Sequence, residues 1–109
     1  MKKEYDLVVV GAGPAGIMAA LTAKKYNDKL RVALVDSGKS IGQKLAITGG
    51  GRCNFTNNRP IDEFFDMVVN NNKFLYSSFY GFTNEDLKDF IRGLSLDYSI
   101  ESGNDQKVY

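Results

Sequence analysis

The stretch that most constrains the fold is VVVGAGPAG, residues 8–16, in which a glycine-rich turn follows a run of valines. The run Tyr5–Val10 is compact and β-branched, which predicts a strand buried on both faces, as in a parallel sheet. Residues Pro14–Tyr26 favour a helix, since proline is tolerated in a first turn. A second apolar run, Arg31–Asp36, predicts a second strand. Together they form one βαβ unit with an expected right-handed crossover.

Three glycines in this turn, Gly11, Gly13 and Gly16, have the G-x-G-x-x-G spacing. The first makes a tight turn, the second lets the backbone approach a pyrophosphate, and the third lets helix and strand pack closely. The pyrophosphate then faces the N–H groups at the helix N-terminus. Asp36 ends the second strand roughly 20 residues further on, where an acid accepts hydrogen bonds from an adenosine ribose. This context predicts a dinucleotide site.

A second glycine cluster, TGGGRCN, occupies residues 48–54. Consecutive glycines can present successive backbone N–H groups as an anion-binding concavity. Arg52 adds a charged fork suited to phosphate or to polar ring edges. NAD is usually held mainly by the first turn, whereas FAD is long enough to need support further along. We therefore interpret the two glycine turns as holding one long cofactor, FAD.

The rest of the chain predicts shorter elements. Residues 37–59 are loop-like, and KLAIT (residues 44–48) could be a strand or a helical turn. Beyond them we expect helices over Ile61–Val69, Lys73–Tyr80 and Asn84–Arg92, a strand over Leu96–Glu101 and another starting at Gln106. The last helix is the best marked, because Thr83 and Asp86 fit a capping box and Gly93 ends it. Its buried stripe is expected at Leu87, Phe90, Ile91 and Leu94.

The expected fold class is α/β, a Rossmann-type βαβ dinucleotide-binding domain that is incomplete and is followed by short helices and a strand. We expect residues 1–109 to be the N-terminal part of one FAD-binding domain. Within it, residues 1–58 hold the βαβ unit and the glycine-rich loop, and residues 59–109 hold the helical segment and the start of further strands. Two strands and one helix do not make a stable doubly wound sheet, so we expect a longer parent protein.

The composition narrows the function. With 14 Lys and Arg against 13 Asp and Glu, the net charge is +1, so we expect no nucleic-acid partner. The chain has no histidine, and its single cysteine makes neither a disulfide nor a clustered zinc site, so we expect no metal. Glu4 and Asp6 spoil a signal-peptide n-region, and the apolar run that follows is short for a membrane span. We expect a reduced cytoplasmic protein with no membrane partner.

The sequence also resembles the aminoacetone oxidase family of FAD-binding flavoproteins. The resemblance rests on VVVGAGPAGIMAA, GQKLAITGGGRCNFTN and FTNED, and on a glutamate followed by KVY, in this order along the whole chain. The string GGGRCN is far more specific than the first glycine motif. The family includes bacterial flavoprotein oxidoreductases and is similar to flavin reductases proposed in bile-acid metabolism.

The resemblance implies an FAD-binding Rossmann-type domain and a set of cofactor-binding residues. Around the FAD pyrophosphate it places Gly11, Gly13, Pro14, Ala15 and Gly16, with Asp36 on the ribose. Nearer the ribityl chain and the flavin it places Gly50, Gly51, Arg52, Cys53 and Asn54. Two residues depart from the pattern, because the ribose acid is usually glutamate and a basic residue usually stands where Gln43 does. Lys44 is then the lysine that remains to contact the cofactor.

The expected function is that of the FAD-binding part of a flavoprotein oxidoreductase, in which the flavin transfers hydride or electrons to or from a small molecule. NAD(P)H is a candidate electron donor. We assign no catalytic acid or base, because none can be argued from the residues of this chain. Two alternatives stay open: an NAD(P)-dependent dehydrogenase, which leaves TGGGRCN unexplained, and a non-catalytic dinucleotide-binding module.

Overall fold

The computed structural model describes residues 2–103 and 105–109. The chain forms two compact units, Met1–Cys53 and Asn54–Tyr109, which we call unit 1 and unit 2. Each unit is described by itself.

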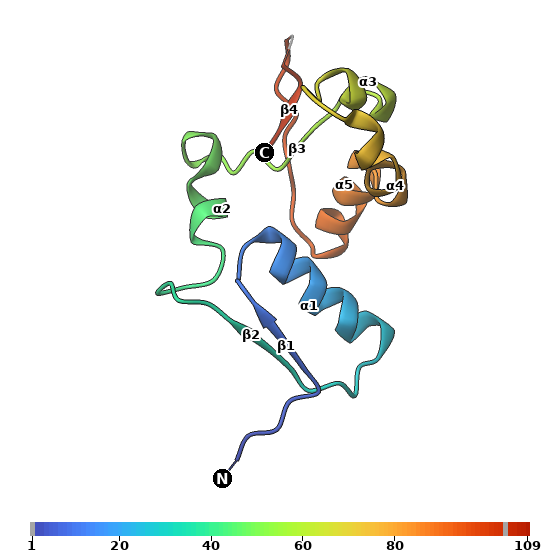
Figure 1. The fold of residues 1–109 in the computed structure, drawn as a ribbon. Helices are drawn as coiled ribbons and strands as arrows, with labels where there is room; N and C mark the ends of the chain where they lie inside the picture. Colours follow the sequence, from blue (N-terminus) through green and yellow to red (C-terminus); the bar gives the residue numbers. More distant parts are fainter. Residues whose placement is uncertain (1, 104) are drawn as a thin grey trace. The chain divides into compact units, whose positions relative to one another are not determined.

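Unit 1 is a βαβ unit followed by a short helix and a glycine loop (Figure 1). Its elements are β1 (Leu7–Val10), α1 (Pro14–Tyr26), β2 (Val32–Val35), α2 (Gln43–Ile47) and the 3₁₀-helix η1 (Thr48–Gly51). The predicted helix is confirmed at both ends, and both strands lie within their predicted runs. The segment KLAIT, left open between strand and helical turn, is mostly helical.

The two strands pair in parallel, with Leu7 opposite Val32 and Val10 opposite Val35. At the start of the pair, the Asp6 carboxylate accepts hydrogen bonds from Arg31 N at 2.8 Å and Arg31 Nη2 at 2.9 Å. These bonds hold the pKa of Asp6 at about 2. The hydrogen bonds between Asp6 and Arg31 join the residue before β1 to the residue before β2, so the two strands begin in register. The α/β Rossmann-type fold class is confirmed.

One expectation about the strands is wrong, because they are not buried on both faces. Leu7 and Val9 are half-buried, whereas Val8 is 52% and Val10 is 85% exposed. The helix α1 lies along the pair, as Figure 1 shows, and covers one face of it. Within the described part of unit 1 no other element covers the opposite face, so alternate valines remain in contact with solvent.

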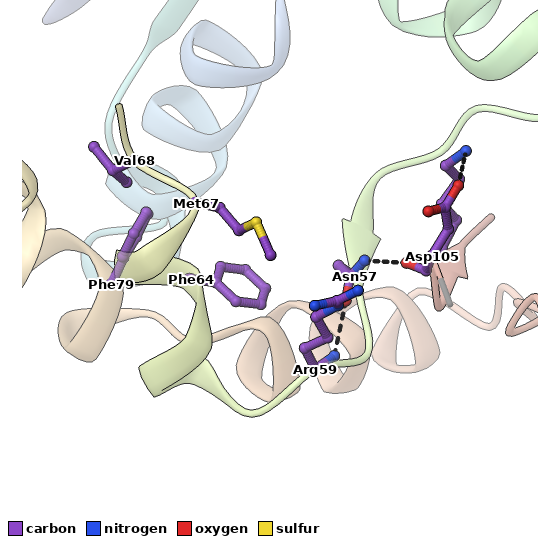
Figure 2. Close-up of a pocket in the computed structure, with 8 residues that line it drawn as sticks. Asn57, Arg59, Phe64, Met67, Val68, Phe79 and Asp105 are labelled. Carbon is purple, nitrogen blue, oxygen red and sulfur yellow. Dashed lines mark hydrogen bonds and ion pairs between the residues drawn. The ribbon is translucent and has the colours of Figure 1, made fainter. Parts of the chain in front are cut away.

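Unit 2 combines a two-stranded antiparallel sheet with short helices (Figure 1). Its elements are β3 (Thr56–Asn57), α3 (Ile61–Asp66), the 3₁₀-helix η2 (Asn72–Leu75), α4 (Tyr76–Gly81), α5 (Asn84–Gly93) and β4 (Lys107–Val108). Val108 is fully buried. A cavity lies beside this sheet and α3 (Figure 2). The strand expected from Gln106 on is confirmed as β4, whereas β3 lies in a segment we expected to be a loop.

Two other expectations for unit 2 need correction. The first predicted helix ends at Asp66 and does not reach Val69, since β-branched Val68 and Val69 disfavour a helix and Asn71 takes a left-handed φ of 54°. No strand forms over Leu96–Glu101. Ile100 alone makes a bridge, to Val108, across a chain reversal in which Gly103 and Gln106 have positive φ.

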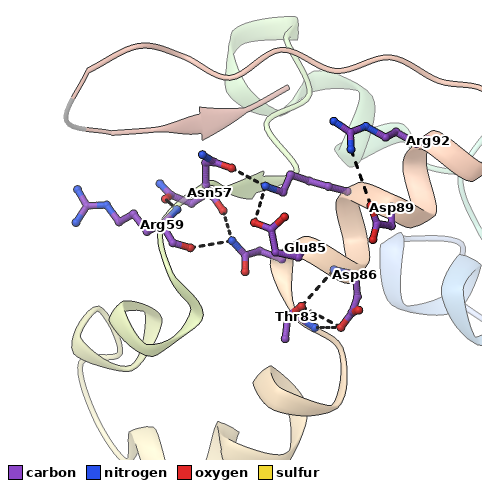
Figure 3. Close-up of polar contacts among 10 residues, drawn as sticks. Asn57, Arg59, Thr83, Glu85, Asp86, Asp89 and Arg92 are labelled. Atoms are coloured by element: carbon purple, nitrogen blue, oxygen red, sulfur yellow. Dashed lines mark hydrogen bonds and ion pairs between the residues drawn. The ribbon is translucent and has the colours of Figure 1, made fainter.

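The capping box of α5 is confirmed, and the helix includes Gly93. Thr83 Oγ1 accepts a hydrogen bond from Asp86 N at 3.2 Å, and Thr83 N donates to Asp86 Oδ2 at 2.8 Å (Figure 3). The stripe is less buried than expected, because Leu94 is 50% exposed and the other members are half-buried.

The most buried positions of α5 are polar: Asn84 and Lys88 are each 5% exposed. Asn84 Nδ2 donates to the carbonyl oxygens of Asn57 at 2.7 Å and Arg59 at 2.9 Å (Figure 3). Lys88 Nζ donates to Asn58 Oδ1 at 2.5 Å and pairs with Glu85 at 2.6 Å. Buried polar groups are tolerated when they are paired in this way. The helix therefore fixes residues 57–59 by hydrogen bonds more than by apolar packing.

Candidate functional site

The first glycine turn joins the ends of both strands in unit 1. Gly11 follows β1 with a φ of +100°, which a residue with a side chain rarely adopts. Its N–H donates to Val35 O at 2.7 Å, so the turn is bonded to the last residue of β2. A Cβ on Gly16 would stand 1.8 Å from Gly11 O. The predicted turn and the predicted close approach of helix to strand are both present.

Gly13 differs from the other two glycines. Its φ of −81° is ordinary, so the backbone does not require glycine here. An ideal Cβ at this position would meet open space, with no atom of the described residues within 4 Å. Gly13 is the N-cap of α1, and among the described side chains none caps the helix. The first N–H groups of such a helix have no intrahelical acceptor, so an anion placed there could accept from them.

Asp36 follows β2 and binds the glycine turn directly. Its Oδ2 accepts a hydrogen bond from Ala12 N at 2.7 Å, and its Oδ1 accepts one from Gly38 N at 2.6 Å. These two backbone donors and the nearby charge of Lys44 lower the pKa of Asp36. A carboxylate has about four lone-pair positions. Each oxygen therefore keeps capacity to accept a hydroxyl group, as a ribose contact requires.

These groups line one cavity of about 420 Å³ that is formed by unit 1 alone. Three residues proposed from the sequence, Gly13, Asp36 and Lys44, belong to its wall. The other lining residues are Ala12, Ser37, Gly38, Ser40, Gly42 and Gln43. The volume lies within the ~300–1,000 Å³ usual for ligand pockets. The cavity is lined by the N-terminus of α1, the carboxylate of Asp36 and the side chain of Lys44.

Sequence reasoning missed the segment that forms the far wall. Gly42 has a φ of +66°, and its N–H donates to Ala12 O at 2.8 Å, which brings the start of α2 against the glycine turn. Ser37, Gly38 and Ser40 form the loop between β2 and α2. A usable signal was present, because ligands of open α/β sheets bind outside the carboxyl ends of the strands. A small-residue loop directly after β2 belongs to that edge.

The second glycine cluster forms a tight loop in unit 1. Gly49, Gly50 and Gly51 have φ values of 61°, 65° and 90°, and Cys53 also takes a left-handed φ of 57°. Cys53 N donates to Thr48 O at 2.9 Å, so the loop closes on itself. The glycine run is thus required by backbone conformation, whether or not a ligand is present. The cysteine N–H is used inside the loop rather than presented outward.

The remaining predicted residues lie on both sides of the boundary between the units. Gly50, Gly51 and Arg52 are exposed, and Cys53 is half-buried. The side-chain oxygen Oδ1 of Asn54, the first residue of unit 2, is buried and has no hydrogen-bond partner among the described residues. These five residues do not line the 420 Å³ cavity.

Among residues 2–103 and 105–109, no cluster of three or more acidic, cysteine or histidine side chains could hold a metal ion. In the same part of the chain, no helix is both long and apolar enough to cross a membrane.

Three curated relatives match between about half and nine tenths of this chain. A ribosomal RNA dihydrouridine synthase from Escherichia coli (strain K12) is 44% identical over 55 residues, which are 50% of this chain and 13% of the relative. The enzyme of that name from Haemophilus influenzae is 31% identical over 98 residues, 90% of this chain and 23% of the relative. A 3-dehydro-bile acid delta(4,6)-reductase from Clostridium scindens is 39% identical over 49 residues, 45% of this chain and 12% of the relative.

This chain therefore covers less than a quarter of the length of each of these relatives. Two of these relatives are named as ribosomal RNA dihydrouridine synthases, and the third is named as a reductase. Residues 5–109 match the family described as the HI0933-like protein Rossmann domain, which includes both units. The chain belongs to the HI0933-like Rossmann domain family.

Proposed function

We propose that this chain is the FAD-binding part of a flavoprotein oxidoreductase. The single observation that carries the proposal is the space at Gly13, where a Cβ would meet no described atom and where the 420 Å³ cavity begins. At this helix start and cavity wall, a glycine that neither φ nor packing requires leaves room for a ligand to approach the backbone. Membership of a Rossmann domain family and relatives named as reductases support a dinucleotide as that ligand.

The residues present fit the adenosine half of FAD. The turn residues that would surround the pyrophosphate are Gly11, Gly13, Pro14, Ala15 and Gly16. Asp36 would accept the ribose hydroxyls on the lone pairs that Ala12 and Gly38 leave unused. Lys44 lines the same cavity, so its ammonium group would add positive charge near the phosphates.

The flavin half would be held by the second loop and the residue after it. We propose Gly50, Gly51, Arg52, Cys53 and Asn54 for this role. The support is the resemblance of GGGRCN to the aminoacetone oxidase family, together with the buried Oδ1 of Asn54, for which the described residues supply no partner. When bound, the flavin supplies the hydride or electron transfer, and the protein supplies binding and orientation. A small-molecule substrate, with NAD(P)H as electron donor, completes the proposal.

A second candidate substrate is RNA. The similarity to the Haemophilus influenzae ribosomal RNA dihydrouridine synthase extends over 98 residues and so includes most of unit 2. The matches to the bile acid reductase cover only 49 residues. The near-neutral charge of the chain argues against a nucleic-acid surface within these residues, and our expectation of no nucleic-acid partner stays a prediction.

The absorption spectrum of the purified protein tests the cofactor. We expect a yellow protein with flavin absorption bands, and release of free FAD on heating. A colourless protein that takes up NAD and not FAD would favour the dehydrogenase alternative. A protein that holds a dinucleotide but shows no turnover with reduced nicotinamide and a range of acceptors would favour a non-catalytic binding module.

A further inference from the structure

Unit 2 contains its own cavity, of about 490 Å³, which the proposed cofactor site does not use. The size is again that of a small-molecule pocket. Figure 2 shows its two kinds of wall, with apolar side chains on one side and polar ones on the other. The apolar wall consists of Phe64, Met67, Val68 and Phe79, and the polar wall of Asn57, Arg59, Asp105 and Lys107.

The apolar wall is fixed by aromatic contacts. The rings of Phe64 and Phe79 lie 5.8 Å apart at 86°, an edge-to-face arrangement that aromatic pairs favour. Phe79 also packs edge-on against Phe65 at 5.2 Å. Met67, in contrast, is 64% exposed although it lines the cavity. A ligand that covered Met67 and the Phe64 ring would gain roughly 25 cal/mol for each Å² of apolar surface removed from water.

Hydrogen bonds to neighbouring residues fix the polar wall. The buried amide of Asn84 donates to the carbonyl oxygens of Asn57 and Arg59, at 2.7 Å and 2.9 Å. The Asn57 side chain accepts from Arg59 N at 2.9 Å and donates to the carbonyl oxygen of Asp105. These bonds join β3 to the loop before β4. The wall is therefore organised without a ligand, and binding would require little reordering of the backbone.

The charge of the polar wall selects the ligand. Two of the lining residues, Arg59 and Lys107, are cations, and one, Asp105, is an anion. Lys107 Nζ lies 2.8 Å from Asp105 Oδ2, and Arg59 Nη1 lies 3.7 Å from Glu63, which is outside the lining. Lys107 and, more weakly, Arg59 lower the pKa of Asp105, so both cations act on the same space. Within the lining, two cations stand against one carboxylate, so an anion is favoured over a cation of similar shape.

We propose that this cavity binds a small carboxylate with an apolar ring, the ring against Phe64 and Met67 and the carboxylate beside Arg59 and Lys107. The present carboxylate partners do not block such a ligand. The side chains of Glu63 and Asp105 are 50% and 67% exposed, and exposed ion pairs contribute only ~0–1 kcal/mol. A ligand carboxylate can therefore replace one of them or share its cation.

The first experiment is a calorimetric titration of the purified protein with three compounds that share a naphthalene ring and carry substituents of different charge. They are 2-naphthoate (an anion), 2-naphthamide (neutral) and 2-naphthylmethylamine (a cation). We expect the anion to bind about tenfold or more tightly than the neutral compound, as charge-assisted hydrogen bonds predict, and the cation to bind weakest. Equal affinities, or no binding of the anion at millimolar concentration, would overturn the proposal.

The second experiment locates the site with matched variants. Arg59→Gln should weaken 2-naphthoate binding about tenfold. Arg92→Gln removes a comparable ion pair, with Asp89 on α5, and should leave the binding unchanged. Met67→Gln should weaken all three compounds, whereas the change Val69→Thr at a 92% exposed valine should not. If Arg59→Gln lowers the melting temperature, Lys107→Gln replaces it. Equal losses in both members of a pair would overturn the proposal. Flavin content is measured in parallel and should not change.

Discussion

The two glycine clusters of unit 1 have similar composition but contain glycine for different reasons. In the first turn Gly11 is required by its φ of +100°, Gly16 by a clash at 1.8 Å, and Gly13 by neither. In the second loop Gly50 and Gly51 both have left-handed φ values, and a Cβ on either would meet open space. A glycine-rich motif therefore indicates a ligand only where a glycine remains that the backbone does not need. By that criterion the first turn is the stronger site.

The largest effect should come from Gly16→Val. The new Cβ would overlap Gly11 O, which is backbone and cannot move aside cheaply. We expect a loss of roughly 3 kcal/mol or more in the free energy of unfolding, measured by urea denaturation. Gly81→Val is the matched control, because a Cβ there meets open space. A Gly16→Val protein as stable as the control would show that α1 and β1 are not closely packed.

Gly13→Val should separate binding from folding. The φ of −81° suits valine, so we expect the free energy of unfolding to change by less than about 1 kcal/mol. The side chain would project into the proposed pyrophosphate position, so the purified variant should have lost its flavin. Flavin content is read from the absorption spectrum after purification. Stoichiometric FAD in this variant would remove the first turn from the site.

The sequence predicted unit 1 well because its signals are local. A valine run that ends at glycine, and proline at the start of a helix, each depend on neighbouring residues only. These local signals predicted the bounds of α1, the tight turn at Gly11 and the close helix–strand approach at Gly16. The exposure of Val8 and Val10 did not, because it depends on what covers the sheet and not on the strand itself.

Unit 2 was harder to predict because its order comes from contacts distant in sequence. The sheet of β3 and β4 pairs Thr56 with Val108, and no local pattern marks so short a strand. The capping box of α5 was local and was found. The burial of Asn84 and Lys88 was missed, because a polar residue on a helix is expected to be exposed. Only the contacts with residues 57–59 explain why these two are buried. The cavity of unit 2 depends on the same contacts.

Arg52→Leu tests whether the second loop binds the cofactor at all. If Arg52 contacts FAD, its loss forfeits a charge-assisted hydrogen bond of ~1.5–3 kcal/mol, which is roughly ten- to a hundredfold in affinity. The measurement is an FAD titration of the apoprotein beside wild type. Arg92→Leu, on the exposed side of α5, controls for the loss of a charge. Unchanged affinity with unchanged apoprotein stability would mean that TGGGRCN serves the fold alone.

Gly50 offers a smaller and purely conformational test. Its φ of +65° is left-handed, which alanine adopts at a cost of ~1–2 kcal/mol and asparagine at a lower cost. We therefore expect Gly50→Ala to unfold at lower urea concentration than Gly50→Asn, with wild type the most stable. FAD affinity measured on all three proteins shows whether the added side chain also touches the cofactor. Equal stabilities would contradict the backbone explanation for this glycine.

The smallest effect should be seen at Asp36, as a change in pH dependence. Hydrogen bonds from Ala12 N and Gly38 N lower the pKa of Asp36 in the folded protein. A lowered carboxyl pKa contributes stability that is present above the unfolded pKa, near 3.8, and is lost as pH falls through the folded pKa. Asp36→Asn removes this pH-dependent contribution, because the amide does not titrate and offers one acceptor oxygen where the carboxylate offers two.

The test for Asp36 is urea denaturation of apoprotein between pH 2.5 and 7. Above about pH 4 the wild type should be more stable than Asp36→Asn, and the difference should shrink as the carboxylate protonates. Asp28→Asn, at an exposed acid between α1 and β2, is the matched control and should leave this acid-side slope in place. A constant difference at all pH values would mean that the substitution acts through packing. In that case the ionised carboxylate would not be what joins β2 to the glycine turn.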